Sequence, residues 1–262
     1  MAGTSDVPLD DLGYAVACEH PARRVVSLVP SLTEAVAATR RAALVGATQW
    51  CTHPADLDVA RVRGTKNPSV AAITDLSPDL VLANQEENRR LDVDRLRGKG
   101  VPVWVTVIRS VDEAFSSMRR MFLEGLGWEV PEWLDEAARA WGDPSLANQP
   151  RAAICVWRDP WMVVGSDTFT GDVAARLGLS NVFSDYPGRY PRVSVDDILA
   201  LDPDVVVLPD EPYEFTATDG PEAFPGRRVA LVSGRDLTWY GPSLVGARSR
   251  LAASLGLGSG RQ

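Results

Sequence analysis

One pattern of apolar and polar positions occurs twice in this chain. A helical stretch ends at a Pro-Asp corner and an unbroken run of leucine and valine follows, first from Ile73 to Leu82 and again from Ile198 to Leu208. Proline ends a helix and favours an extended conformation for the residue before it. The apolar run is typical of a strand covered on both faces, as in a parallel sheet. The pattern therefore predicts an α/β fold.

The spacing of the pattern predicts two similar lobes. Pro78 and Pro203 lie 125 residues apart, and predicted strands that begin at Val25 and Ala152 have nearly the same offset. A corner of this kind is common in α/β proteins, so the Pro-Asp match alone leaves a chance recurrence open. We expect parallel sheets flanked by helices in an N-terminal lobe, an interlobe helical linker, a C-terminal lobe and a ligand cleft between the lobes. The expected boundaries are 1–110, 111–150 and 151–262.

Charge and composition exclude several classes of partner. The 262 residues carry a net charge of −8, and the acidic residues are spread along the chain. This charge argues against nucleic acid and anionic membrane as partners. No segment approaches the roughly 18 apolar residues of a membrane helix. The three cysteines form no close pair and there are only two histidines, so neither a zinc site nor a disulfide framework is indicated.

The N-terminal region leads to a prediction about location. Residues 1–11 contain three aspartates, no basic residue and no apolar run, and we expect a loose tail there. Ala15-Val16-Ala17-Cys18 faintly resembles a lipoprotein cleavage site, but a secretion signal needs a basic start and an apolar stretch of about 7–15 residues. The sequence thus favours a cytoplasmic protein whose Cys18 is unmodified and lies in a short β-hairpin.

Aromatic and polar residues gather where the predicted strands end. Ligands of open parallel sheets bind beyond the carboxyl ends of the strands, and aromatic walls with a few polar groups suit a large flat or apolar ligand. A single tryptophan is more often a core residue than a ligand contact, and a single acid is more often solvated. The predicted ligand-binding residues are Ser31, Trp50, Glu86, Asn88, Arg109, Trp157, Trp161, Tyr190, Glu211, Asp236, Trp239 and Tyr240.

Ser31 is included because it stands at a predicted helix start. Ser31 and Glu34 have the spacing of a capping box, and the free N–H groups of a helix start suit an anionic or polar ligand atom. A plain helix cap explains the same residues equally well. Catalytic signatures are missing, because the sequence contains neither a P-loop nor a G-x-S-x-G motif, and no catalytic residue is predicted.

Three motifs in this order resemble a known family. They are Arg24-Val-Val-Ser-Leu-Val-Pro30-Ser-Leu-Thr-Glu34, Ser77-Pro78-Asp79-Leu80-Val81 and Val101-Pro-Val103-Trp. The chain is similar, over roughly residues 12 to 256, to the class III periplasmic binding proteins. These helical-backbone metal receptors include the cobalamin- and iron–siderophore-binding components of ABC importers. The resemblance implies two α/β lobes, a rigid helix between them and a metal chelate held in the cleft. By position, Trp50 matches an aromatic cleft residue and Asp236 to Tyr240 match the last cleft loop.

The chain departs from the family pattern in three ways. It shows no secretion signal, and its second predicted linker helix, residues 132–141, would span only about 15 Å. Each lobe of the cobalamin receptor also presents a glutamate to its membrane permease, and those positions are Ala71 and Asp196 here. A clamp that lacks one charge loses the benefit of simultaneous engagement. We therefore expect no docking on an ABC permease.

These observations lead to one principal interpretation and two rivals. The principal interpretation is a cytoplasmic, non-catalytic binding protein for a metal chelate: a corrinoid, a haem or a ferric siderophore. The first rival is an enzyme that inserts or releases metal in the same cleft, using Glu86, Glu211 or Asp236 as a ligand or as an acid or base. The second is an interaction module with an empty cleft. Whether side chains bind the metal directly is left open.

Overall fold

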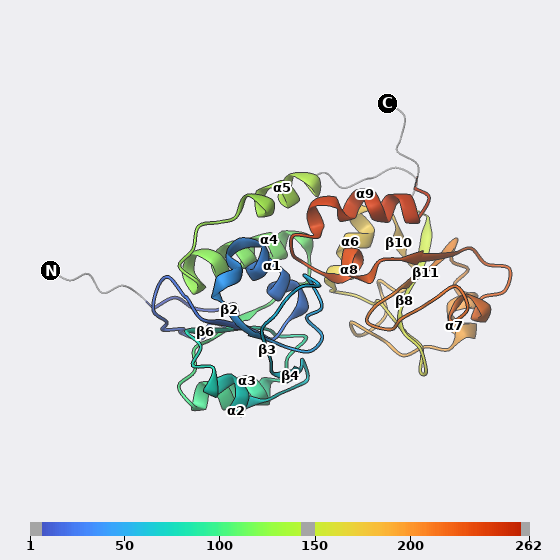
Figure 1. Ribbon diagram of the computed structural model, residues 1–262. Coiled ribbons are helices and arrows are strands. Elements are labelled where there is room, and N and C mark those ends of the chain that lie inside the picture. Colours follow the sequence, from blue (N-terminus) through green and yellow to red (C-terminus); the bar gives the residue numbers. More distant parts are fainter. Residues whose placement is uncertain (1–6, 143–149, 258–262) are drawn as a thin grey trace. The chain divides into compact units, whose positions relative to one another are not determined.

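A computed structural model describes residues 7–142 and 150–257 and divides them between two compact units (Figure 1). Unit 1 contains the described residues of Met1–Ile108 together with Glu113–Leu134 and Tyr240–Pro242. Unit 2 contains Arg109–Asp112, the described residues of Asp135–Trp239 and those from Ser243 onward. Each unit is an α/β structure, which confirms the predicted two-lobe fold class with parallel sheets flanked by helices.

Unit 1 is built on a parallel sheet with the strand order β3-β2-β1-β6-β7. The strands are β1 (Val25–Ser27), β2 (Leu44–Ala47), β3 (Ala60–Arg61), β6 (Leu80–Asn84) and β7 (Val103–Thr106), with β4 (Arg63–Gly64) and β5 (Asn67–Pro68) as a separate antiparallel pair. The helices are α1 (Pro30–Arg40), η1 (Arg41–Ala43), α2 (Val70–Asp75), α3 (Arg90–Gly98), most of α4 (Val111–Arg120) and the π-helical turn η2 (Met121–Gly125).

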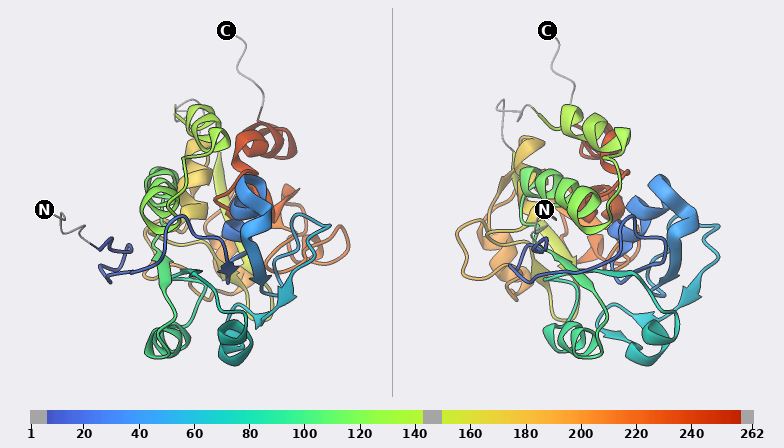
Figure 2. Two further views of the ribbon diagram at one scale, coloured as in Figure 1. Left: turned by 60° about the vertical axis from the view of Figure 1, so that its left-hand side comes forward. Right: turned by 90° about the vertical axis from the view of Figure 1, so that its left-hand side faces the viewer.

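The core of unit 1 explains why its strands read as continuous apolar runs. Val26, Val81 and Val103 from three neighbouring strands pack with Ile73 of α2 and Leu96 of α3 on one face of the sheet. Figures 1 and 2 show α2 and α3 next to each other on this face and α1 on the opposite one. Since both faces are covered, apolar residues occur at successive strand positions.

Unit 2 repeats this arrangement. Its parallel sheet has the order β10-β8-β11-β12, and β9 pairs antiparallel with β8. The strands are β8 (Arg151–Trp157), β9 (Met162–Val163), β10 (Ser180–Asn181), β11 (Val205–Pro209) and β12 (Val229–Val232). The helices are most of α5 (Glu132–Ala140), then α6 (Phe169–Arg176), α7 (Val195–Ala200), η3 (Pro221–Ala223), α8 (Gly234–Thr238) and α9 (Leu244–Ser254). An apolar cluster joins Cys155 and Val206 of the sheet to Ile198 of α7.

The two Pro-Asp corners have matching hydrogen bonds. The carboxylate of Asp79 accepts from the backbone N–H of Arg24 at 2.8 Å, and that of Asp204 accepts from the N–H of Arg151 at 2.7 Å. Each of these arginines also donates from its guanidinium to the carbonyl at the end of the helix before the corner. Arg24 donates to Leu76 O and Arg151 to Leu201 O. The residue before each proline is left-handed and not extended as expected, with a φ of 45° at Ser77 and 47° at Asp202. The two corners are therefore equivalent in structure as well as in sequence.

The helices between the predicted lobes are shared between the units. Glu113–Leu134 group with unit 1, whereas Arg109–Asp112 and the described residues from Asp135 group with unit 2, so α4 and α5 each contribute to both. The predicted end of this helix at Gly142-Asp-Pro144 falls partly on residues 143–149, which lie outside the described residues. The role of 111–150 as a separate linker stays a prediction. None of the helices in the described ranges combines the length and apolar character needed to cross a membrane.

The prediction of a loose tail is wrong for residues 7–11. Residues 7–17, which we call the N-terminal strap, are attached to unit 1, and Leu9 pairs with Ala15 as an antiparallel bridge. The side chain of Asp10 is fully buried and accepts hydrogen bonds from Val105 N at 3.2 Å and from the Arg97 guanidinium at 2.5 Å. The rest of the predicted tail, residues 1–6, lies outside the described residues.

A second strap aspartate makes the same kind of contact. Asp11 accepts from the Arg120 guanidinium at 2.6 Å, from the Ser117 hydroxyl and from Val107 N at 2.9 Å. These two carboxylates attach the strap to β7 and α4. Two of the three aspartates that resemble a solvated tail, Asp10 and Asp11, therefore form buried or half-buried ion pairs.

We expect Cys18, which follows the strap, to react slowly with alkylating reagents. Its Sγ donates to Gly125 O at 3.1 Å, and burial, with a smaller contribution from the charge of Asp79, raises the thiol pKa from 9.0 to about 11. At pH 8 the thiolate fraction is then about a hundredfold below that of an unperturbed thiol. Iodoacetamide labelling of the native protein at pH 8, followed by peptide mass analysis, should show a correspondingly slow rate that recovers in urea. Native Cys18 labelling at the urea rate would contradict this burial.

Candidate functional site

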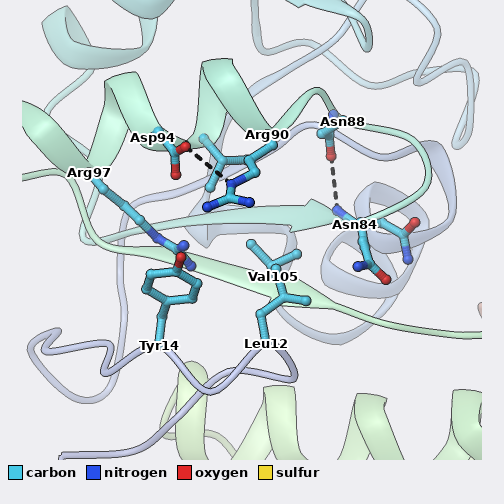
Figure 3. A pocket seen from close by; sticks show the side chains of 10 residues that line it. Leu12, Tyr14, Asn84, Asn88, Arg90, Asp94, Arg97 and Val105 are labelled. Carbon is cyan, nitrogen blue, oxygen red and sulfur yellow. Dashed lines mark hydrogen bonds and ion pairs between the residues drawn. The ribbon is translucent and has the colours of Figure 1, made fainter.

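The carboxyl edge of the unit 1 sheet is shaped by two asparagines. Asn84 ends β6, and its side-chain oxygen accepts from the backbone N–H of Glu86 at 2.8 Å. The side-chain oxygen of Asn88 accepts from Asn84 N at 2.9 Å (Figure 3), and its amide donates to Thr65 O at 3.0 Å. Asn88 is buried and joins the loops after β6 and β4. The side-chain oxygen and amide of Asn88 are used in hydrogen bonds to backbone atoms of these loops, and a ligand contact from Asn88 stays a prediction.

Trp50 lies on the loop after β2 and is the most exposed large aromatic side chain among the described residues. Its relative exposure is 61%, whereas the adjacent Cys51 is completely buried. The indole lies over Gly64, where an added Cβ would come within 3.3 Å of the indole nitrogen. The large apolar ring of Trp50 is therefore exposed to solvent, although the residue that follows it, Cys51, is buried in the core.

The structure corrects the prediction of a capping box at Ser31. Helix α1 begins at Pro30, its N-cap residue is Val29, and no side chain caps it. Proline is favoured at the first helical position because it needs no hydrogen-bond partner there. Ser31 therefore lies inside the first turn at 2% exposure, and Gly241 packs against it so closely that an added Cβ would be 3.0 Å from Ser31 O. Tyr240, adjacent to Gly241, is also buried.

A second exposed indole lies at the carboxyl edge of the unit 2 sheet. Trp157 ends β8 with 42% exposure and packs edge-on against Tyr213, with ring centroids 5.6 Å apart. The Tyr213 hydroxyl donates to Asp219 at 2.7 Å, and this hydrogen bond raises the tyrosine pKa above its usual value. Arg158 forms ion pairs with Asp219 and Glu222. The sequence did not indicate Asp219, because its charged partner Arg158 is 61 positions away in the chain.

Other predicted site residues in unit 2 are buried in the structure. Trp161 is 9% exposed and stacks on Phe215 at 5.7 Å within the apolar core. The buried carboxylate of Asp236 accepts two hydrogen bonds from Arg250, at 2.6 and 2.7 Å. Trp239 is also buried. Trp161 and Asp236 thus have structural contacts within unit 2, and ligand contacts from all three residues stay predictions.

The remaining predicted residues are accessible. Arg109 is exposed and lies 3.6 Å from the Asp167 carboxylate in unit 2. Tyr190 and Glu211 are partly exposed in unit 2, and Glu86 is partly exposed in unit 1, where Lys66 donates to its backbone carbonyl at 2.6 Å. The structure thus places the twelve predicted residues in two separate sets, one per unit. The interlobe cleft that the resemblance implies stays a prediction.

Unit 1 also contains a pocket of about 220 Å³ between the strap, α3 and β7 (Figure 3). Its lining consists of Leu12, Tyr14, Asn84, Gln85, Asn88, Arg90, Val93, Asp94, Arg97 and Val105. Arg97 pairs with Asp10 and stacks on the Tyr14 ring at 4.1 Å, and Arg90 lies 3.5 Å from Asp94. Its charged groups are thus paired within the protein, and its volume is below the roughly 300 Å³ of typical ligand sites. Within the described ranges, no three His, Cys, Asp or Glu side chains form a group that could hold a metal ion.

Comparisons with known proteins show sequence similarity to vitamin B12-binding proteins. No family model matches the chain. The vitamin B12-binding protein of Pectobacterium carotovorum subsp. carotovorum is 25% identical over 250 residues, which cover 89% of this chain and 88% of that protein. The vitamin B12-binding protein of Vibrio cholerae is 26% identical over 196 residues, or 71% of this chain and 70% of the relative. The resemblance to the class III periplasmic binding proteins is confirmed.

Solved structures of receptors from this family have the same fold. The periplasmic vitamin B12-binding protein BtuF of Vibrio cholerae superposes with a TM-score of 0.71 at 19% identity and covers 92% of this chain and 99% of its own. The periplasmic heme-binding protein RhuT from Roseiflexus gives 0.70 at 21% identity, covering 88% and 97%. Both match nearly their whole length, so both lobes of the class III architecture are represented here.

The prediction of a cytoplasmic location is wrong in the light of these relatives. BtuF and RhuT are both described as periplasmic proteins. The prediction relied on residues 1–11, which are acidic and contain neither a basic residue nor an apolar run. Two of their three aspartates, Asp10 and Asp11, form ion pairs with unit 1. The predicted cytoplasmic location was one argument against docking on an ABC permease, and that argument no longer holds. The comparisons do not support the expectation of no permease docking either.

Proposed function

We propose that this protein is a binding protein for a metal chelate that works outside the cytoplasm. Its relatives are named for binding vitamin B12, and neighbouring structures are named for binding B12 or heme. A corrinoid or a haem is therefore the first choice of ligand, ahead of a ferric siderophore. Both are large, flat, metal-containing rings, and such ligands suit an aromatic surface.

The exposed indole of Trp50 carries this proposal. A tryptophan left 61% exposed on a fixed loop contributes only part of its apolar area to folding. It lies beyond the carboxyl end of β2, where ligands of parallel sheets bind. A flat ligand that covers the ring would gain about 1–3 kcal/mol from apolar area and ring stacking. Trp157 offers a comparable ring at the corresponding edge of unit 2.

The rival enzymatic interpretation has less support. The relatives of this protein are named as binding proteins, not as enzymes. Of the three acids considered for catalysis, Asp236 is buried and bound by two hydrogen bonds from Arg250. A carboxylate engaged in this way is poorly placed to exchange a proton with a ligand or to bind its metal.

The experiment that tests the proposal is a ligand panel. We expect cyanocobalamin or ferric haem to quench the tryptophan emission of the purified protein saturably, because both absorb strongly and would lie near Trp50. After several hours with the protein, chromatography and mass analysis should recover the ligand unchanged. If neither these two nor a ferric hydroxamate siderophore quenches the emission, the proposal fails. If a metal-free or metal-exchanged product accumulates with time, the enzymatic interpretation replaces it.

A further inference from the structure

The backbone on both sides of Trp50 is held by one guanidinium. Arg61, in β3, donates from Nη1 to Thr48 O at 3.1 Å and to Cys51 O at 3.0 Å. Its Nη2 donates to Leu57 O at 3.0 Å. Three carbonyls of the loop at residues 48–57 thus converge on a single side chain. The planar fork of arginine suits this geometry, whereas a lysine ammonium lacks it.

Buried contacts fix the same loop from inside the core. The Sγ of Cys51 accepts from the Thr33 hydroxyl at 3.0 Å and lies 3.1 Å from the Thr48 hydroxyl. Burial raises the pKa of the Cys51 thiol, so the group is neutral at pH 7 and functions as a packing element. Gln49 N donates to Arg63 O at 2.8 Å, which fixes the residue before Trp50. The backbone is therefore bound at positions 48, 49 and 51.

This arrangement presents the indole in one fixed position. A free loop loses conformational entropy when a ligand orders it, and that loss reduces the affinity. Here the entropy is lost on folding, before the ligand arrives. We propose that Arg61 is a positioning residue of the ligand site, which increases affinity by holding Trp50 in its binding position. This inference rests on the proposed function, because it takes Trp50 as a ligand contact.

Arg41 provides a matched control in the same loop. Its guanidinium donates to Asp56 O at 2.5 Å and to the Asp56 carboxylate at 3.1 Å. Asp56 lies in the loop but six positions from Trp50, and its side chain is exposed. Arg41→Ala therefore removes a guanidinium and its bonds to this loop without removing a bond to the residues that flank Trp50.

The test combines affinity with a local signal from the indole. We expect Arg61→Ala to weaken cyanocobalamin or haem binding by about fivefold or more through lost preorganisation, with Arg61→Lys intermediate and Arg41→Ala within about twofold. In a Trp50→Ala background, Arg61→Ala should have almost no further effect, because coupled residues are not additive. In protein labelled with 5-fluorotryptophan, the ¹⁹F resonance of Trp50 is the one that is missing from the spectrum of Trp50→Phe. This resonance should broaden or shift in Arg61→Ala and remain unchanged in Arg41→Ala.

The outcomes separate this inference from the proposed function. If Trp50→Ala weakens binding and folded Arg61→Ala does not, Arg61 is no positioning residue, and the proposed function stands. If Trp50→Ala leaves the affinity unchanged, the site assignment fails, and the ¹⁹F resonance alone still shows whether Arg61 orders the indole. If Arg61→Ala does not fold, Arg61→Lys gives the same comparison. A wild-type ¹⁹F signal and affinity in Arg61→Lys would then overturn the inference.

Discussion

Asp10→Ala should lower the free energy of unfolding by about 3–5 kcal/mol, the cost of removing one partner from a buried ion pair. The Asp10 side chain has no exposed surface and that of Arg97 has only 19%. Asp10 also accepts from the backbone N–H groups of Leu12, Tyr14 and Val105. The substitution therefore leaves a largely buried guanidinium and three backbone donors without their acceptor.

Urea denaturation followed by circular dichroism measures this loss. Asp94→Ala is the matched control, because it removes a carboxylate from an exposed pair with Arg90 whose side chains are 47% and 84% exposed. The control should change the free energy of unfolding by at most about 0.5 kcal/mol. Equal midpoints for Asp10→Ala and the control would show that the strap is not a structural part of unit 1.

Trp50→Ala should weaken binding of the preferred chelate by about 1–3 kcal/mol, or roughly 5- to 150-fold. The reason is the loss of the exposed ring that the ligand would cover. Isothermal titration of each folded variant gives the affinities directly.

Two further variants distinguish a ligand contact from general damage. Leu91→Ala removes an equally exposed apolar side chain, 59% exposed on α3, and should leave the affinity within about twofold of the wild type. Trp161→Ala removes a ring stacked in the core and should instead lower the free energy of unfolding by about 3–5 kcal/mol. If Trp50→Ala and Leu91→Ala have the same affinity, the assignment of the site to the carboxyl edge of unit 1 is wrong.

Local patterns in the sequence were sufficient for the fold. The Pro-Asp corners follow from residues that are neighbours in the chain, and the structure adds the matching arginine contacts of Arg24 and Arg151. Apolar runs such as Val205 to Leu208 predict buried parallel strands because a strand covered on both faces has no polar side. Both signals depend on short-range order, which a single sequence displays.

Contacts between distant residues could not be predicted in this way. Asp10 and Arg97 are 87 positions apart, so an aspartate in a buried pair looked like one in a solvated tail. Trp157 and Trp161 lie on either side of one tight turn, and only the packing of Phe215 shows that the second is a core residue. The capping box failed for a local reason, because Pro30 starts the helix one residue before Ser31.

The most direct test of the central claim is native mass spectrometry of the purified protein after incubation with cyanocobalamin and, separately, with ferric haem. We expect a single added mass equal to one intact chelate per chain for at least one of them. The added mass should be released unchanged on denaturation and be strongly reduced in Trp50→Ala. An unliganded spectrum with both chelates and with a ferric hydroxamate siderophore, at concentrations where a known receptor is saturated, would contradict the assignment of this protein as a chelate-binding receptor.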